Sequence, residues 1–535
     1  MKTQGDSVKV SILVGLFMLA LSSAVQAQFN FTTNSDGSLN LASYTGPGGA
    51  VAIPSTINVG GTNLTVTTIG IEAFFFQTSI TNVTIPDSVI SIGDSAFSKC
   101  YGLTSAALGN GVTSIGGLAF FACGLTSVTI PGGVTNIGYS AFEGCVDMTN
   151  ATIADGVISI GGSAFYECTS LASVTIPGSV VSIGHDAFDF CTGLNSAIIA
   201  MGVASIGDNA FYDCSSLTSV TVPGSITNFG IGAFADCVSL TNATIADGVT
   251  SIGSDAFQYC TSLTSITIPV TVTSIENSAF SSCSSLATIL VDSQNHFYSS
   301  LDGVLFDKSQ STLILCPEGK GGSYTIPNSI TSFGPYPFAG CFNLTSVVIP
   351  GNVTNIGAAA FAGCTGLTNV TIADGVTSIE SSAFNNCTSL PNVTIPGSVT
   401  NVGDSAFAYC YKLGSVFFKG NAPAEHPSVF SPEWNATVYY LPGTTGWGPT
   451  FDGLLTMLWN PQARTNDGSF GVQNNQFGFN ITGSSNLVVV VEACTNLASP
   501  TWIPVGNYTL NGGSTYFSDA LWANYPTRFY RLSSP

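Results

Sequence analysis

Cysteine is the residue whose number and spacing in this sequence could support chemistry. The 535-residue chain has 15 cysteines. Thiols form disulfides in exported proteins, bind metals, or act as nucleophiles when an adjacent base activates them. No Cys-x-x-Cys pair or Cys/His cluster is present, so the sequence predicts no metal ligation and no cofactor. Thirteen cysteines recur at an interval of 23 residues almost throughout: Cys100, Cys123, Cys145, Cys168, Cys191, Cys214, Cys237, Cys260, Cys283, Cys341, Cys364, Cys387 and Cys410.

A fixed period of this size is typical of a repeat array, in which each cysteine occupies one structural position of successive coils. Stacked positions lie about 5 Å apart, inside the distance range of a disulfide, but parallel side-chain directions fit that bond poorly. Free cysteine often packs as a small core hydrophobe. Buried free thiols are therefore the favoured interpretation, with disulfides between coils as the alternative.

The other residue types that catalysis would need are scarce. The three histidines, His185, His296 and His426, lie in different regions, and no motif pairs any of them with a nucleophile. No nucleophile elbow, phosphate-binding loop or metal-binding signature is present. The sequence therefore predicts a protein that is not an enzyme.

Acidic residues recur in a second, longer period. The turn that follows each predicted strand alternates between a Pro type and an Ala-Asp-Gly type, the latter at Asp155, Asp247 and Asp374. This alternation indicates duplication of a two-coil unit. A calcium-binding edge is one interpretation, but the Gly-Gly-x-Gly-x-Asp calcium pattern is absent, so an Asp-Gly turn chosen for its backbone preferences is favoured.

One coil can be followed from Cys168. Leu171, Val174 and Ile176 predict a short strand with its apolar side chains pointing inward. Pro177 ends this strand because proline cannot donate a hydrogen bond. The Ala187-Phe188 pair then suits one short helical turn that faces the core. A coil this small cannot bury its own apolar side, so we expect it to be stable only when stacked on its neighbours. The Ala-Phe marker recurs at Phe74, Phe97, Phe120, Phe142, Phe165, Phe188, Phe211, Phe234, Phe257, Phe280, Phe338, Phe361, Phe384 and Phe407.

These residues resemble the BspA-like class of leucine-rich repeats found in bacterial surface proteins, whose pattern is LxxVxIPxxVxxIGxxAFxxC. The resemblance covers 51–419, with a hairpin-type insertion at about 287–326. It implies a repeat solenoid with a parallel β-sheet on one face and short helical turns on the other. It also implies adhesion or recognition outside the cell, but it supplies no ligand.

The regions outside the repeats suggest four further parts. Residues 1–27 combine Lys2 and Lys9 with a short apolar run and a small-residue site at Ala27, which predicts a secretory signal peptide. We expect no transmembrane segment in the mature chain, because no later apolar run approaches about 20 residues. The other predicted parts are an N-terminal cap at 28–50, a C-terminal cap and linker at 420–468, and a small all-β, sandwich-like module at 469–535.

Charge restricts the possible partners. The chain has 10 Lys and Arg against 30 Asp and Glu, a formal net charge of −20, and no Lys or Arg between Lys99 and Lys308. Such a surface repels phosphate backbones, so nucleic acid is excluded as a partner class. The expected partner is an extracellular protein or a surface polymer.

Aromatic side chains in the variable positions beside the Ala-Phe marker are the predicted binding residues, because aromatic residues are enriched among interface anchors. Such side chains can equally cover the outer turns of neighbouring coils. We expect a non-catalytic, secreted or cell-surface binding or adhesion protein, with a structural surface-layer or fibre component as the alternative. The predicted residues are Phe121, Tyr166, Phe190, Tyr212, Tyr259 and Tyr409.

Overall fold

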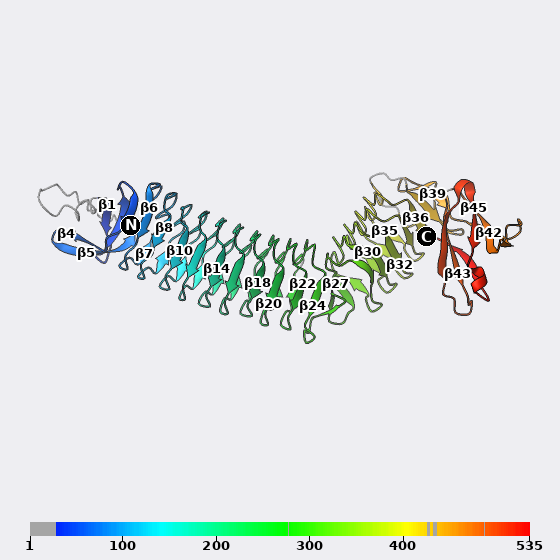
Figure 1. Cartoon of the computed structure of the whole chain (residues 1–535), viewed down its shortest axis with the longest axis horizontal. Helices are drawn as coiled ribbons and strands as arrows, with labels where there is room; N and C mark the ends of the chain where they lie inside the picture. The colour runs from blue at the N-terminus through cyan, green and yellow to red at the C-terminus, as the bar shows by residue number, and fades with distance from the viewer. Residues whose placement is uncertain (1–27, 277, 425–427, 432–435, 486, 535) are drawn as a thin grey trace. The chain divides into compact units, whose positions relative to one another are not determined.

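A computed structural model describes most of the chain (Figure 1). The predicted signal peptide at 1–27 lies outside the described residues. The chain divides into two compact units, Met1–Ser300 and Leu301–Pro535, and each is described by itself. The described residues are 28–276, 278–424, 428–431, 436–485 and 487–534.

Each coil of the first unit contributes one strand to each of two parallel sheets. The strand β10 (Ser127–Ile130) pairs in register with β12 (Asn150–Ile153), and β11 (Asn136–Ile137) pairs with β13 (Ser159–Ile160). In the four-residue strands the side chains alternate between exposed and buried, as expected for a sheet with one face on the core. The predicted strand and its Pro-ended turn are therefore present, and a second short strand follows in every such coil.

The same pairing continues along both sheets. The further strands of the sheet that contains β10 are β3 (Gly49–Ala52), β6 (Ile80–Thr84), β8 (Ser105–Ala107), β14 (Ser173–Ile176), β16 (Ser196–Ile199), β18 (Ser219–Val222) and β20 (Asn242–Ile245), and β22 (Ser265–Ile268) pairs with β24 (Thr288–Val291). Those of the sheet that contains β11 include β5 (Thr62–Ile69), β7 (Ser91–Ile92), β9 (Ser114–Ile115), β15 (Ser182–Ile183), β17 (Ser205–Ile206) and β19 (Asn228–Phe229), and β21 (Ser251–Ile252) pairs with β23 (Ser274–Ile275).

The Ala-Phe segment does not form the predicted helical turn. In each coil the residues two before and two after the phenylalanine have positive φ, as at Ser95 (53°) and Lys99 (61°) around Phe97. Alternate amides close tight turns within the coil, while those between donate to the next coil, as Phe97 N–H does to the Ala119 carbonyl at 2.7 Å. The prediction was wrong because hydrogen bonding between coils replaces the bonds within a helix that the local pattern suggested. Among the described residues, the helical segments are two short 3₁₀ helices near the C-terminus, η1 (Asn511–Gly513) and η2 (Trp522–Asn524).

The repeat phenylalanines stack face to face through the core. Between Phe74 and Phe280, successive ring centroids are 4.6 to 5.8 Å apart and the rings are within 15° of parallel. Tyr44 continues the stack at its start, 5.0 Å from Phe74. This tyrosine belongs to β2 (Leu39–Tyr44), which pairs antiparallel with β1 (Phe29–Thr33) and parallel with β5. The N-terminal strands thus cover the first coil by supplying one more ring.

The cysteine thiols are buried and free. Most of them point at the backbone of the preceding coil, as Cys191 Sγ donates to the Phe165 carbonyl at 3.2 Å. Burial raises the pKa of the Cys145 thiol to about 12. Each thiol therefore serves as a small hydrophobe and hydrogen-bond donor between coils.

The two turn types interlock. The Gly202 amide, in an Ala-Met-Gly turn, donates to Ser225 Oγ of the next coil at 3.1 Å, and that hydroxyl donates to the Val203 carbonyl at 2.6 Å. Gly248 with Thr271 repeats the arrangement at 2.9 Å. Gly202 has φ of +116°, and a Cβ there would lie 2.1 Å from the Gly178 carbonyl oxygen. Gly202 must therefore be glycine because the Gly178 turn of the preceding coil leaves no room for a side chain, and its amide is paired by the Ser225 hydroxyl of the next coil.

The second unit begins with an antiparallel hairpin of β26 (Val304–Asp307) and β27 (Thr312–Leu315), inside the predicted insertion. The strand β27 pairs in parallel with β29 (Ser332–Phe333), so the hairpin continues directly into a coil. The following strands are β28 (Gly322–Thr325), β30 (Leu344–Ile349), β31 (Asn355–Ile356), β32 (Asn369–Ile372), β33 (Ser378–Ile379), β34 (Asn392–Ile395), β35 (Asn401–Val402) and β36 (Ser415–Phe418).

Coils continue beyond the last predicted one. Phe430 stacks on Phe407 at 5.9 Å although Val429 replaces the usual alanine before it. The strands β37 (Thr437–Tyr440) and β39 (Leu454–Leu458) extend the sheet of β36 in parallel. The stretch that was interpreted as a linker therefore supplies a further strand of the solenoid, together with β38 (Thr450–Phe451), which pairs antiparallel with β39.

The C-terminal residues form two small antiparallel sheets (Figure 1). Their core includes Phe479 and Phe517, and it also contains Phe417 of β36 and Tyr439 of β37. These two rings occupy the outward position that Thr394 holds one coil earlier. The first sheet comprises β40 (Gln462–Arg464), β41 (Gly471–Gln473), β42 (Gln476–Thr482) and β45 (Ser514–Asp519), and the second comprises β43 (Val488–Cys494), β44 (Ile503–Thr509) and β46 (Phe529–Ser533).

Glycine at the Ile-Gly corner gives a matched test of coil stacking. A Cβ at Gly184 would lie 2.5 Å from the Gly162 backbone nitrogen, whereas a Cβ at Gly357, in the same position of another coil, meets no atom within 4 Å. We expect Gly184→Ala to cost at least about 2 kcal/mol because the coils must separate. Gly357→Ala should be nearly neutral. Hydrogen exchange around each site measures both, and equal effects would contradict the account.

Thiol reactivity tests the buried cysteines. We expect the folded protein, prepared without reductant, to react with almost no equivalent of a thiol reagent, because the thiols are inaccessible and their pKa values are raised. In denaturant without reductant, close to 15 equivalents should react. A count near zero in denaturant would instead establish disulfides.

Candidate functional site

In each coil, the two positions after the phenylalanine of the Ala-Phe segment form the outer turn. The position directly after the phenylalanine holds Tyr166, Asp189 and Tyr212 in three successive coils. The next position has positive φ, 56° at Phe190, and turns the chain back toward the cysteine. Since each coil repeats the same conformation, residues in one position form a column, and a local pattern of aromatic residues becomes a continuous surface.

Three of the six predicted binding residues come together. The rings of Tyr166 and Phe190 are 5.8 Å apart at 75°, and those of Phe190 and Tyr212 are 5.9 Å apart at 62°. All three are half-buried. Edge-to-face packing of this kind fixes the orientation of the rings, and their half-buried state leaves part of each side chain on the surface. We call these three residues the aromatic row.

The other predicted residues are not part of this row. Phe121 and Tyr259 lie at the equivalent positions of other coils in the first unit, and Tyr409 lies in the second unit, where its ring is 6.3 Å from Tyr411. Tyr259 and Tyr409 are exposed. An equivalent position in the repeat is therefore not enough to place a residue in the row, because the rings touch only when aromatic residues occur in consecutive coils.

Asp189 lies in the same column as Tyr166 and Tyr212 and is only 7% exposed. Its Oδ1 is fully buried and has no hydrogen-bond partner among the described residues. Burial, reinforced by the Asp186 carboxylate and opposed by the Phe190 amide, raises the pKa of Asp189 to about 7. A carboxylate with this environment is unusual, because buried charges are normally paired.

Further carboxylates surround this position. Asp213 and Glu167 each help to raise the pKa of Asp189, and burial raises the pKa of Asp213 itself. The hydroxyl of Tyr212 bonds to Asp236, which together with burial raises the pKa of Tyr212 to about 12. The predicted binding residues are all aromatic and do not include Asp189. The available signal was an aspartate between two tyrosines in one column of the repeat.

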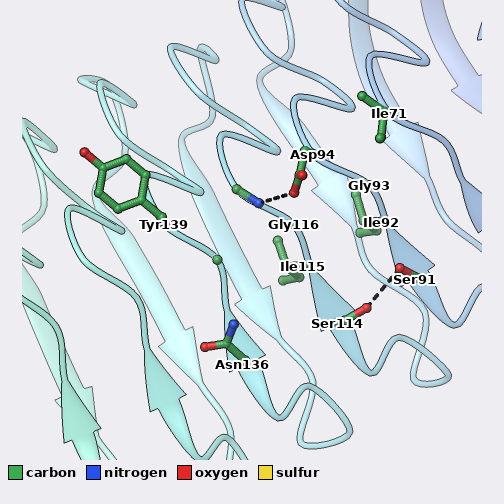
Figure 2. Close-up of a pocket in the computed structure, with 12 residues that line it drawn as sticks. Ile71, Ser91, Ile92, Gly93, Asp94, Ser114, Ile115, Gly116, Asn136 and Tyr139 are labelled. Atoms are coloured by element: carbon green, nitrogen blue, oxygen red, sulfur yellow. Dashed lines mark hydrogen bonds between the residues drawn. The ribbon is translucent and has the colours of Figure 1, made fainter.

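A shallow open groove lies at the corner beside the sheet of β7 and β9 (Figure 2). Ile71 and Tyr139 lie at opposite ends, with Asp94 between them. Several of its polar atoms are already occupied, since Asp94 Oδ1 accepts from the Gly117 amide at 2.7 Å and Ser114 Oγ donates to Ser91 Oγ at 2.9 Å. Glycines form much of its floor because a side chain there would overlap the neighbouring coil.

The threonines near the strands also have structural roles. Thr104 Oγ1 donates to the Thr81 carbonyl at 3.1 Å, and Thr149 Oγ1 donates to that of Thr126 at the same distance. The second sheet repeats this, as Thr273 Oγ1 donates to the Thr250 carbonyl at 3.2 Å. Many hydroxyls thus link each coil to the one before it.

Among the described residues, no group of three or more His, Cys, Asp or Glu side chains is arranged to hold a metal ion. His185 is exposed and pairs with its neighbour Asp186 at 2.9 Å. No helix in the described part of the chain is both long and apolar enough to cross a membrane.

The repeats match the family model described as "BspA type leucine rich repeat region (6 copies)", over residues 67–195, 181–311 and 320–433. The chain belongs to this family. The predicted resemblance is thereby confirmed. Leucine-rich repeat proteins of this kind are a non-enzymatic fold associated with recognition at bacterial surfaces.

Solved structures of leucine-rich repeat proteins are similar to the chain. A leucine-rich cell surface protein from Faecalibacterium prausnitzii is 28% identical, with 73% of this chain and 86% of that chain covered and a TM-score of 0.39. A leucine-rich repeat protein from Bacteroides ovatus is 22% identical, with coverage of 73% and 93% and a TM-score of 0.45. The pneumococcal vaccine antigen PcpA is 18% identical, with coverage of 78% and 92% and a TM-score of 0.36. No curated protein matches the sequence.

Asp189→Asn tests the electrostatics of the site. The pKa of Asp189 is about 7 in the folded protein and about 3.8 in the unfolded chain, so the folded state binds the proton more tightly and loses stability as the pH rises from about 4 to about 7. Asparagine removes this cost. We expect it to increase stability more at pH 8 than at pH 5, by about 1–2 kcal/mol, with allowance for solvent screening.

Denaturant unfolding at both pH values measures this difference. Asp147→Asn is the control, because Asp147 is an exposed carboxylate of the same unit. The control should change stability equally at the two pH values. A pH-independent effect of Asp189→Asn would contradict the raised pKa.

Proposed function

We propose that this protein is a non-catalytic, exported binding protein that recognises an extracellular protein through the outer turns of its solenoid. The aromatic row carries the proposal. Tyr166, Phe190 and Tyr212 offer rigid rings with polar edges in consecutive coils, which is the composition of an interface anchor. The stacked coils hold them in place, so little conformational entropy is lost on binding.

The charge of this region supports a protein partner over a nucleic acid. Carboxylates surround the row, and the sequence has no Lys or Arg between Lys99 and Lys308. An acidic surface with aromatic anchors repels phosphate and attracts a partner with basic side chains. Phe121 and Tyr259, at equivalent positions in other coils of the first unit, are two further proposed contacts with the partner. Tyr409 is a separate proposed contact in the second unit.

Action at the cell surface or in the medium is part of the proposal. The signal-like pattern of residues 1–27 supports export. The association of BspA-type repeats with bacterial surfaces agrees with it. The expected binding role needs no cofactor and no catalytic residue.

Replacement of the aromatic row tests the function. Full-length protein should retain a partner from cell-surface or matrix extracts, and the purified partner should bind with a measurable dissociation constant. We expect Tyr166→Ser, Phe190→Ser and Tyr212→Ser together to weaken this binding at least about tenfold, because anchor residues each contribute 1 kcal/mol or more. Surface interferometry measures the change.

The matched control replaces exposed tyrosines elsewhere, Tyr101→Ser with Tyr336→Ser. The control should bind normally, and both variants should keep the circular dichroism of the parent. Unchanged affinity of the triple variant would contradict the proposed surface. Self-assembly of the parent into fibres, without partner binding, would favour the structural alternative.

A further inference from the structure

Among the described residues, no basic side chain acts on Asp189 as a counter-charge to its ionised form. Asp189 is only 7% exposed, and its Oδ1 has no hydrogen-bond partner among the described residues. The groups that act on it from the neighbouring segments are Asp186, Asp213 and Glu167, which are all acidic. The nearby His185 is engaged with Asp186. The electrostatic environment therefore favours an external cation.

The residues around this carboxylate are suited to an organic cation. Asp189 is close enough to Tyr166 and to Tyr212 to raise the pKa of each hydroxyl, so it lies between the two tyrosines. Phe190 contacts both of those rings. Aromatic faces attract cations, and they favour arginine because its planar guanidinium stacks on rings and sheds water readily.

We propose that Asp189 and the aromatic row form a receptor site for an arginine side chain of the protein partner. The guanidinium would donate to the exposed part of the Asp189 carboxylate while its plane lies against a ring of the row. The inference rests on the proposed binding function and specifies what that surface recognises. Because Asp189 can accept a further hydrogen bond and lies beside the rings of the aromatic row, one arginine could bond to the carboxylate and stack on a ring at the same time.

This site is expected to respond to pH. A guanidinium binds the ionised form of Asp189, and binding must remove the proton that the free site holds below about pH 7. The acids that face Asp189, namely Asp186, Asp213 and Glu167, oppose its ionisation. The two tyrosines stay neutral from pH 6 to pH 8, because an ordinary phenol ionises only near pH 10 and the pKa values here are raised further. Affinity for an arginine peptide should therefore increase from pH 6 to pH 8.

The test uses the full-length protein and a fluorescein-labelled peptide with four arginines spaced by Gly-Ser, at about 0.15 M salt, where long-range attraction is screened. A second peptide has citrulline, which is neutral and nearly isosteric, in place of each arginine. We expect Asp189→Asn to weaken binding of the arginine peptide about tenfold and to abolish the increase between pH 6 and pH 8. Phe190→Leu should weaken it about threefold or more, since it removes a ring face.

The control Asp147→Asn removes the same formal charge from an exposed position of the same unit and should change affinity less than twofold. Equal losses in Asp189→Asn and Asp147→Asn, or binding of the citrulline peptide, would overturn the arginine site. Displacement of the peptide by millimolar Ca²⁺ in the parent but not in Asp189→Asn would also overturn it and assign the carboxylate to a metal.

The same variant separates this inference from the proposed function. If partner binding is lost in the triple aromatic variant but retained in Asp189→Asn, the aromatic surface stands and the arginine site fails. If the arginine peptide binds as expected but no extracellular partner depends on the aromatic row, the proposed function fails and the cation site remains.

Discussion

Face-to-face stacking of one phenylalanine per coil is the contact on which the rest of the structure depends. The centroid separation preferred by aromatic pairs, about 4.5–7 Å, includes the spacing of strands in a sheet, about 4.7–4.9 Å, so the 5.1 Å spacing of Phe165, Phe188 and Phe211 suits the hydrogen bonds of both sheets. The thiols, the glycine corners and the interlocking turns all keep the coils at this spacing. A side chain of different thickness at the stacked position would change the spacing between coils and so disturb both sheets and the turns that connect them.

The repeat made most of this architecture predictable from sequence. Cys168, Phe188 and their equivalents gave the period, and Pro177 located the end of the strand. The period could not give the conformation of the Ala-Phe segment, because residues such as Lys99 and Phe190 adopt positive φ where carbonyl groups of the adjacent coil accept hydrogen bonds from their amides. Local propensity favours a helical turn, and the stacking overrides it.

The ends and the site were less predictable for related reasons. Phe430 was missed because valine replaces alanine before it, and the last strands lack the repeat pattern. Near the C-terminus, Arg528 forms an ion pair with Asp519 at 2.9 Å, and Arg531 forms one with Glu492 at 2.6 Å. No sequence motif predicts these two contacts. Likewise, six aromatic candidates could be named from their positions, but the importance of Asp189 emerged only from its burial between two of them.

The interlocking turns also constrain how such an array can change in length. The hydroxyl of Ser225 or Thr271 serves the glycine amide of the coil before it, and the two turn types differ in sequence. Loss of a single coil would place two turns of one type side by side, with a glycine amide unpaired and two bulky turns in contact. Loss of two coils leaves every junction unchanged. Natural variation in this lineage should therefore proceed in steps of 46 residues, twice the 23-residue interval, within regions where the turns alternate.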